Sequence, residues 1–574
     1  MDFIEYVADL TPDLQAQTLD GKVKIAFRLQ PAALCHKTEA VTLVFSIADI
    51  KIKDVSGDWL AAYKVKDNKL FVELNDKQLE ADRDTFITVE YSAAPQEGVI
   101  FADDYVYTRY HTQNWMVSHQ ALEDTAKFDL TLHLPLGMQH VANGELVSSK
   151  PSKPKGNVLR HRWRESRPRP TFTFGFAAGN FKEKVLHHGN RQFRVLYLSS
   201  TAEEIDTIFA DIGKAYDFFE EVSGLPLPAK NYTFVVTEEN SMQEASGFSL
   251  VGRKYLHHVL SEPRESWLAT HELAHEWWGN AISASSWNDF WLNEGLVQFL
   301  VAAFKEKVYG RDEYDREMIF FKESILRRLK NNVFLPAVSP HKTISYEEYM
   351  EKYRGTAYSK GAFLFHMLRL ELGEKDFWRA IKHYSSRMWE KGSSTRELRL
   401  SFEQATGRDL SQFFDTWIHE EQRLELDLKL SVNSDNLLQI TLDQLQQQAR
   451  AFPLQIQVEN STNTALLTFQ VSQKQQHFTR QLPGKPSSIR VDPRHYLPLL
   501  VKSDTLQAYL PQNLTQAKTT VDRYWSMKAL VNSVHCQNSA DFIEAELSKF
   551  AQSGQARILQ TAAQGWLGKC APGN

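Results

Sequence analysis

The spacing of apolar residues changes three times along this chain, and each change limits the folds that it can adopt. Between about residues 22 and 184, short runs such as KVKIAFRL and AVTLVFSI alternate apolar with polar side chains. This period of two is typical of strands with one face in solvent. From about residue 201 to 419, apolar residues recur at i, i+3 and i+4, which is typical of helices. The alternation returns after Arg423, and helical spacing returns after about residue 504.

These changes predict a multidomain α+β protein. We expect an N-terminal all-β domain over 1–185, a mixed α/β domain over 186–422, a small β-sandwich over 423–502 and a short C-terminal helical segment over 503–574. The length of 574 residues agrees with several domains, because a domain averages about 150 residues.

Composition excludes several classes of protein. Hydrophobic residues make up 42% of the chain and charged residues 24%, which excludes a disordered or collagen-like chain. The net charge of −5 predicts no nucleic-acid partner and no anionic membrane surface. The longest apolar stretches, such as LVQFLVAAFKEK, end in charge well before the ~18 residues that a membrane span needs.

The amino terminus and the cysteines bear on location. The opening MDFIEYVADL is acidic where an export signal is basic and then apolar. The chain has three cysteines, an odd number spread far apart along the sequence: Cys35, Cys536 and Cys570. This argues against a disulfide framework and against a CxxC metal site. We therefore expect a reducing, cytoplasmic location, while a signal removed before the first residue would leave the same pattern.

The strongest chemical motif is HELAH at 271–275. Side chains four residues apart on a helix project from one face, so His271 and His275 can bind one metal ion. Zinc suits two imidazoles and leaves a coordination position open. Glu272 is then placed to accept a proton from water. A chance match is the alternative, expected in roughly 5% of chains of this size.

A second carboxylate follows later in the sequence, at a spacing that bears on metal binding. Glu294 stands nineteen residues after His275, at the start of an amphipathic segment that we expect to be a helix. A helix folding back antiparallel to the first would bring Glu294 to the metal as a third ligand. The alternative is a first-turn glutamate stabilised by the helix dipole, which does not explain the spacing.

The segment HELAHEWWGN, followed by the glutamate of WLNEG, resembles the zinc aminopeptidases of the aminopeptidase N family, gluzincins with the pattern HExxH-x18-E. The tyrosine-x-lysine-glycine element of that family matches Tyr358 in AYSKGAFLFHML, and FFDTWI also agrees. The resemblance implies that 186–422 is a thermolysin-like zinc catalytic domain, preceded by a β domain and followed by a β-sandwich and helices.

The resemblance also implies roles for single residues. His271, His275 and Glu294 would bind one Zn²⁺ per chain, and Glu272 would act as general base toward the metal-bound water. Tyr358 would stabilise the developing oxyanion by a hydrogen bond. The alternative for Tyr358 is a tyrosine packed on the core at the start of a helix.

Members of that family read the free ammonium of the substrate with the glutamate of a glycine-x-methionine-glutamate-asparagine strand. Here the segment 241–245 reads SMQEA, so only Glu244 agrees. Glu244 is the expected ammonium anchor, with Glu238 and Glu239 as alternatives. Gln243 replaces the methionine that meets the first substrate side chain, and we expect a more polar pocket with less preference for large apolar residues.

The resulting prediction is a zinc aminopeptidase that hydrolyses peptides with a free amino terminus. The alternatives are a gluzincin endopeptidase, a relative of the epoxide hydrolases in the same superfamily, and a non-catalytic scaffold of the same architecture. The family also places a glutamine of the β domain near the ammonium, for which Gln113 and Gln120 are both candidates. The sequence leaves the oligomeric state open.

Overall fold

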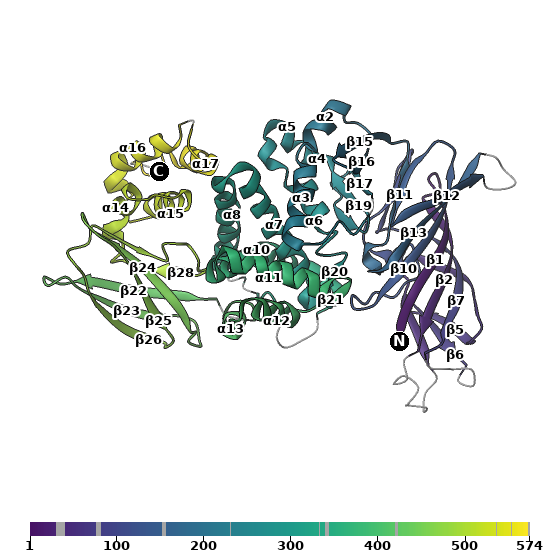
Figure 1. Ribbon diagram of the computed structural model, residues 1–574, viewed down its shortest axis with the longest axis horizontal. Helices are drawn as coiled ribbons and strands as arrows, with labels where there is room; N and C mark the ends of the chain where they lie inside the picture. The colour runs from purple at the N-terminus through teal and green to yellow at the C-terminus, as the bar shows by residue number, and fades with distance from the viewer. Residues whose placement is uncertain are drawn as a thin grey trace. The chain divides into compact units, whose positions relative to one another are not determined.

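The computed structural model describes residues 1–29, 41–75, 82–151, 157–229, 231–331, 333, 335–338, 344–419, 423–534, 536–552 and 554–571 (Figure 1). The chain forms two compact units. The first consists of Met1–Asn293 and Ile381–Ser401, and the second of Glu294–Ala380 and Phe402–Asn574. The division falls inside one helix, α7, immediately before Glu294.

The first unit begins with a β region whose largest sheet has the strand order β12-β13-β10-β1-β2-β7-β4. In β2 the side chains of Val23, Ile25 and Phe27 are fully buried while their neighbours are not, which is the expected alternation. The strands of this sheet are β1 (Asp2–Asp13), β2 (Thr18–Arg28), β4 (Ile50–Gly57), β7 (Asp84–Ala93), β10 (Thr125–Pro135), β12 (Glu145–Pro151) and β13 (Val158–Pro170).

Two smaller sheets complete this region, with the orders β11-β14-β9-β8 and β3-β6-β5. Their strands are β3 (Thr42–Ser46), β5 (Leu60–Lys66), β6 (Lys69–Leu74), β8 (Val99–Phe101), β9 (Tyr105–Thr108), β11 (Gln139–Ala142) and β14 (Phe176–Gly179). One apolar core extends from these sheets to Val235, Phe248 and Leu250 of the sheet that follows.

The mixed α/β part of the first unit is built on a five-stranded sheet of order β15-β16-β17-β19-β18. Strands β17 and β19 are buried throughout, as expected of strands covered on both faces. The elements are β15 (Lys182–His188), β16 (Arg191–Tyr197), α2 (Ala202–Ile208), α3 (Ile212–Ser223), β17 (Tyr232–Thr237), β18 (Gln243–Ala245), β19 (Phe248–Gly252), α4 (Arg253–Leu256), α5 (His258–Ser261), α6 (Trp267–Ala274), β20 (Ile282–Ala284) and β21 (Lys391–Ser393). Helix α2 begins at a capping box formed by Thr201 and Glu204.

Helices of varied length follow, most of them in the second unit. They are α7 (Trp291–Tyr309), α8 (Arg311–Lys330), α9 (Tyr346–Glu348), α10 (Arg354–Leu372), α11 (Glu374–Met388), α12 (Thr395–Thr406) and α13 (Ser411–Trp417). Helix α11 ends in the first unit and α12 begins there.

The second unit also contains two facing sheets of order β26-β23-β22-β28 and β25-β24-β27. Leu426, Leu428 and Leu430 alternate into its core from β22. The strands are β22 (Glu425–Val432), β23 (Leu437–Gln444), β24 (Phe452–Glu459), β25 (Thr464–Val471), β26 (Gln475–Gln481), β27 (Ser488–Val491) and β28 (Leu500–Lys502). The chain ends in helices α14 (Leu510–Thr515), α15 (Thr520–Val531), α16 (Ala540–Phe550) and α17 (Arg557–Trp566), drawn in yellow in Figure 1.

This order of elements confirms the predicted multidomain class, with an N-terminal β region, a mixed α/β middle and a helical C-terminal region. The domain boundaries at 185, 422 and 502 remain predictions. Among the helices of the described residues, none combines the length and apolarity that crossing a membrane requires.

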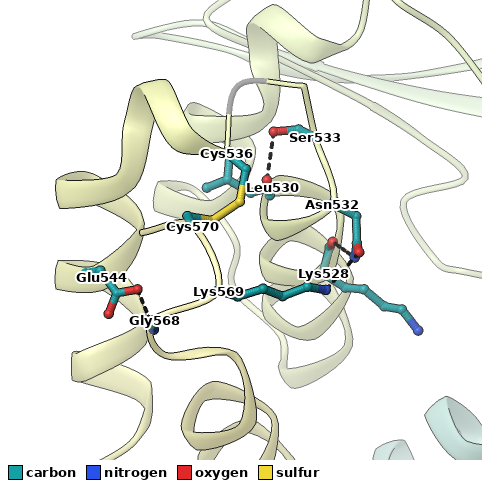
Figure 2. The surroundings of a disulfide bond; sticks show 9 residues. All are labelled: Lys528, Leu530, Asn532, Ser533, Cys536, Glu544, Gly568, Lys569 and Cys570. Atoms are coloured by element: carbon teal, nitrogen blue, oxygen red, sulfur yellow. Dashed lines mark hydrogen bonds between the residues drawn. A yellow bond between two sulfur atoms is a disulfide. The ribbon is translucent and has the colours of Figure 1, made fainter. Parts of the chain in front are cut away.

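The expectation that the cysteines form no disulfide is wrong for two of them. Cys536 and Cys570 are joined by a disulfide (Figure 2). The packing of α15, α16 and α17 around one apolar cluster brings together two residues that lie 34 positions apart. Cys35 lies outside the described residues. The cysteines therefore no longer argue for a reducing compartment, and the cytoplasmic location remains a prediction.

Candidate active site

The HELAH motif lies on a short buried helix of the first unit. Helix α6 ends at Ala274, and His275 follows as its C-cap residue, still in the right-handed helical conformation. His271 and His275 therefore project from the same face. Their Nε2 atoms lie 3.0 Å apart, so the two imidazoles converge on one point.

The backbone around His275 fixes the orientation of its ring. Nδ1 lies 3.0 Å from the carbonyl oxygen of Trp278, to which it donates a hydrogen bond, so Nε2 keeps its lone pair for a ligand. Gly279, with φ 140°, allows this approach, because a Cβ there would lie 2.8 Å from Nδ1 of His275. The tight turn after the helix thus orients a candidate metal ligand.

Two groups of candidate metal ligands include these histidines. Ligand atoms of His271, His275 and Glu294 all lie within 4.8 Å of one another, and so do those of Glu244, Glu272 and His275. All five side chains are buried. Within the first unit, the structure therefore brings together the predicted ligand His275, the predicted base and the predicted ammonium anchor.

Glu294 stands in the first turn of α7, as expected. A Cβ on Gly295 would lie 2.7 Å from Cα of Gly361 and 3.1 Å from the carbonyl oxygen of Ala357, so the backbones of α7 and α10 touch here. Glu294 precedes Gly295 and Tyr358 follows Ala357. This close crossing of two helices of the second unit lies next to both Glu294 and Tyr358 in the sequence.

Glu244 lies on β18, an edge strand paired antiparallel with β19. The turn between these strands is held by Glu276, which follows α6. The carboxylate of Glu276 accepts hydrogen bonds from the backbone N–H of Gly247 at 2.7 Å and from Asn280 at 2.9 Å. Burial raises the pKa of Glu276. Arg169, also buried, donates to Ser246 in the same turn.

The alternative anchors are engaged elsewhere. The carboxylate of Glu239 accepts hydrogen bonds from Tyr105 and Tyr107. Burial alone would raise its pKa, but these two hydrogen bonds lower it overall. Glu238 accepts from the backbone N–H of Ser199 at 3.2 Å.

The two candidate glutamines of the β domain also have partners there. The side-chain amide of Gln120 donates to Ser118 at 2.7 Å, and the backbone carbonyl of Gln113 accepts from the backbone N–H of Ala48. A residue that the sequence did not single out contacts Glu244 instead. The hydroxyl of Tyr110 donates to Oε2 of Glu244 at 2.5 Å, and no sequence pattern marks this tyrosine.

Comparison with known proteins points to the same family as the motifs. Residues 211–417 match the family described as "Peptidase family M1 domain". This match supports the resemblance based on HELAHEWWGN. The predicted metal ligands, Glu272, Tyr358, Glu244 and Gln243 lie within the matched range, while Gln113 and Gln120 lie outside it.

Curated aminopeptidases are similar in sequence over much of the chain. The glutamyl aminopeptidase of Bitis rhinoceros is 22% identical over 491 residues, covering 76% of this chain and 48% of its own length. Aminopeptidase N of Streptomyces lividans is 24% identical, covering 61% of this chain and 42% of its own length. This chain therefore spans about half the length of the curated relatives that it matches.

One solved structure has a similar fold over nearly all of the chain. The structure of Legionella pneumophila aminopeptidase A in complex with aspartic acid has a TM-score of 0.81 at 16% identity, covering 98% of this chain and 67% of that one. At this identity the match establishes the fold alone.

Proposed function

We propose that this chain is a zinc-dependent aminopeptidase that removes single residues from the amino termini of peptides. The observation that carries the proposal is the meeting of Glu244, Glu272 and His275 within 4.8 Å. Glu244 is an acid that can bind an ammonium group. It lies beside Glu272 and His275, an acid and an imidazole that can serve a metal site for hydrolysis.

The donor set fits one zinc ion. Two imidazole nitrogens and a carboxylate oxygen are the ligands of many catalytic zinc sites, and the hydrogen bond from His275 to a backbone carbonyl is the usual support for such a ligand. His271, His275 and Glu294 would hold the ion. When bound, zinc supplies a Lewis acid that polarises the peptide carbonyl and makes water acidic near neutral pH.

The side chains of this chain would move the proton and orient the substrate. Glu272 takes the proton of the attacking water and delivers it to the nitrogen of the leaving amine. Tyr358 donates a hydrogen bond to the oxygen on which negative charge develops. Their positions on α6 and α10 keep the two functions on separate helices.

Glu244 would restrict the enzyme to free amino termini. Two carboxylates held close together, as Glu244 and Glu272 are, repel each other, and a substrate ammonium relieves that repulsion. A blocked amino terminus brings no such charge. Gln243 lies beside Glu244 with its amide held by the backbone N–H of Tyr110 and the carbonyl of Phe172, and it would border the pocket for the first substrate side chain.

Paired fluorogenic substrates test this proposal. We expect an aminoacyl substrate with a free amine to be hydrolysed and its acetylated form to resist, because only the first offers a cation to Glu244. Comparable rates on both would favour the endopeptidase alternative. Hydrolysis of an epoxide without peptidase activity would favour the epoxide-hydrolase alternative, and metal binding without turnover would favour a scaffold.

A scan of aminoacyl substrates tests the pocket separately. With Gln243 in place of methionine, we expect weaker discrimination in favour of large apolar residues. The variant Gln243→Met should shift the preference toward leucine and phenylalanine, measured as the ratio of kcat/KM values. An unchanged ratio would remove Gln243 from the specificity pocket.

A further inference from the structure

Tyr110 connects the N-terminal β domain to both residues of the proposed substrate-reading strand. Its hydroxyl donates to Oε2 of Glu244 at 2.5 Å, and its backbone N–H donates to Oε1 of Gln243 at 2.8 Å. The three residues belong to the first unit. Between Tyr110 and Glu244 lie 134 positions of sequence, so the contact is made by the fold and not by local structure.

The backbone at Tyr110 has an unusual conformation. Tyr110 and His111 have φ values of 48° and 45°, in the left-handed region that side chains larger than glycine rarely adopt. The conformation is held by neighbours, because the backbone N–H of Arg109 donates to Gly98 at 2.8 Å and that of Asn114 to His111 at 2.8 Å. Strained residues of this kind collect at functional sites, and this one aims a hydroxyl at a carboxylate.

The chemistry of this contact is that of orientation. A hydrogen bond from a phenol to an ionised carboxylate is short and strong, and it fixes the torsion of the carboxylate group. Of the two oxygens of Glu244, the tyrosine holds Oε2. The carboxylate is thereby set in one orientation before a substrate arrives, which lowers the entropy lost on binding.

We propose that Tyr110 is a positioning residue that orients Glu244 for the substrate ammonium, and that this is the contribution of the β domain to recognition of a free amino terminus. The inference rests on the proposed role of Glu244 as the ammonium anchor. The β domain then contributes a tyrosine, and the side chain of Gln120, one of the two glutamines considered from the sequence, donates to Ser118 instead.

The chain contains a matched control for this tyrosine. Tyr107, on β9, also donates its hydroxyl to a carboxylate, that of Glu239 at 2.7 Å, and contacts Ser241 at 2.8 Å. Tyr107→Phe and Tyr110→Phe each remove one hydroxyl from one carboxylate. Only the second touches Glu244.

The experiment measures binding with and without a substrate amine. Full-length wild type, Tyr110→Phe, Tyr107→Phe and Glu244→Ala are each titrated with leucine hydroxamate and with its des-amino analogue, and KM and kcat are measured on a free aminoacyl substrate. For Tyr110→Phe we expect KM and the inhibition constant of leucine hydroxamate to rise about ten-fold. The constant for the des-amino analogue and kcat should change little. The ratio of the two inhibition constants does not depend on the folded fraction.

Each outcome decides the inference. A raised ratio for Tyr110→Phe with a wild-type ratio for Tyr107→Phe supports it. Equal weakening of both inhibitors would mean that Tyr110 is only structural, and an unchanged ratio while Glu244→Ala raises it would also overturn the inference. If Glu244→Ala itself leaves the ratio unchanged, the anchor assignment in the proposed function fails, which is a separate result.

Discussion

Two buried groups of ionisable side chains, one in each unit, differ in how their charges are balanced. In the first unit, Glu244 and Glu272 lie beside His275, so two carboxyl groups meet one imidazole. In the second unit, Lys322 pairs with Asp492 at 3.2 Å and Arg490 pairs with Glu459 at 2.8 Å. The second group contains its own counter-charges.

The two groups therefore suit different roles. Burial lowers the pKa of Lys322 while Asp492 counteracts this, as in a self-contained ion pair. The pKa of Asp522, which burial alone would raise, is lowered by His495 and Arg490. In the function that we propose, the carboxylates and imidazoles of the first group would bind a metal ion and a substrate ammonium. We therefore expect substitutions in the first group to impair catalysis and those in the second to impair stability.

The largest effect should come from Glu272→Gln. The amide keeps the shape and cannot accept the proton of water, so kcat should fall about 10³- to 10⁴-fold while the zinc content stays at the wild-type level. Stopped assays and metal analysis on the same sample measure both. Turnover near the wild-type rate would show that Glu272 is not the base and would break the distinction between the two groups.

Next in size is Lys322→Met in the paired group. It leaves Asp492 buried without its cation, so the free energy of unfolding should fall by about 3–5 kcal/mol. Urea denaturation measures this loss, while kcat per folded molecule should not change. The double variant Lys322→Met/Asp492→Asn serves as the control and should recover part of the loss. A large drop in kcat for folded Lys322→Met would contradict the comparison.

Tyr358→Phe tests the proposed hydrogen bond to the oxyanion. Loss of the hydroxyl removes a hydrogen bond that forms fully only as charge develops, so kcat should fall about 10²- to 10³-fold with little change in KM. Steady-state kinetics separates the two parameters. A rise in KM alone would make Tyr358 a substrate-binding residue, and wild-type kinetics would assign it to the packing of α10.

The smallest effect should come from the disulfide of the second unit. Replacing Cys536 and Cys570 by serine opens a loop of 34 residues and should lower the free energy of unfolding of the helical tail by about 2–4 kcal/mol. Wild type treated with a reductant is the matched control and should show the same urea midpoint. Unchanged stability in both samples would mean that helix packing alone holds the tail.

The sequence predicted those features that arise from local pattern. Alternation over Val23, Ile25 and Phe27 predicted strand β2, and the spacing of His271 and His275 predicted their convergence on one face. Contacts between distant segments left no such pattern. The link from Tyr110 to Glu244 and the disulfide both depend on how separate elements pack, and no periodicity in the sequence reports that.

Metal content and activity, measured together on one preparation, show directly whether hydrolysis depends on one bound zinc ion. The enzyme is stripped with a chelator, and zinc is returned in steps while hydrolysis of a free aminoacyl substrate is followed. We predict that activity is lost on stripping and returns in proportion to bound zinc, reaching its full value at one ion per chain. Full hydrolysis by the stripped protein would contradict it.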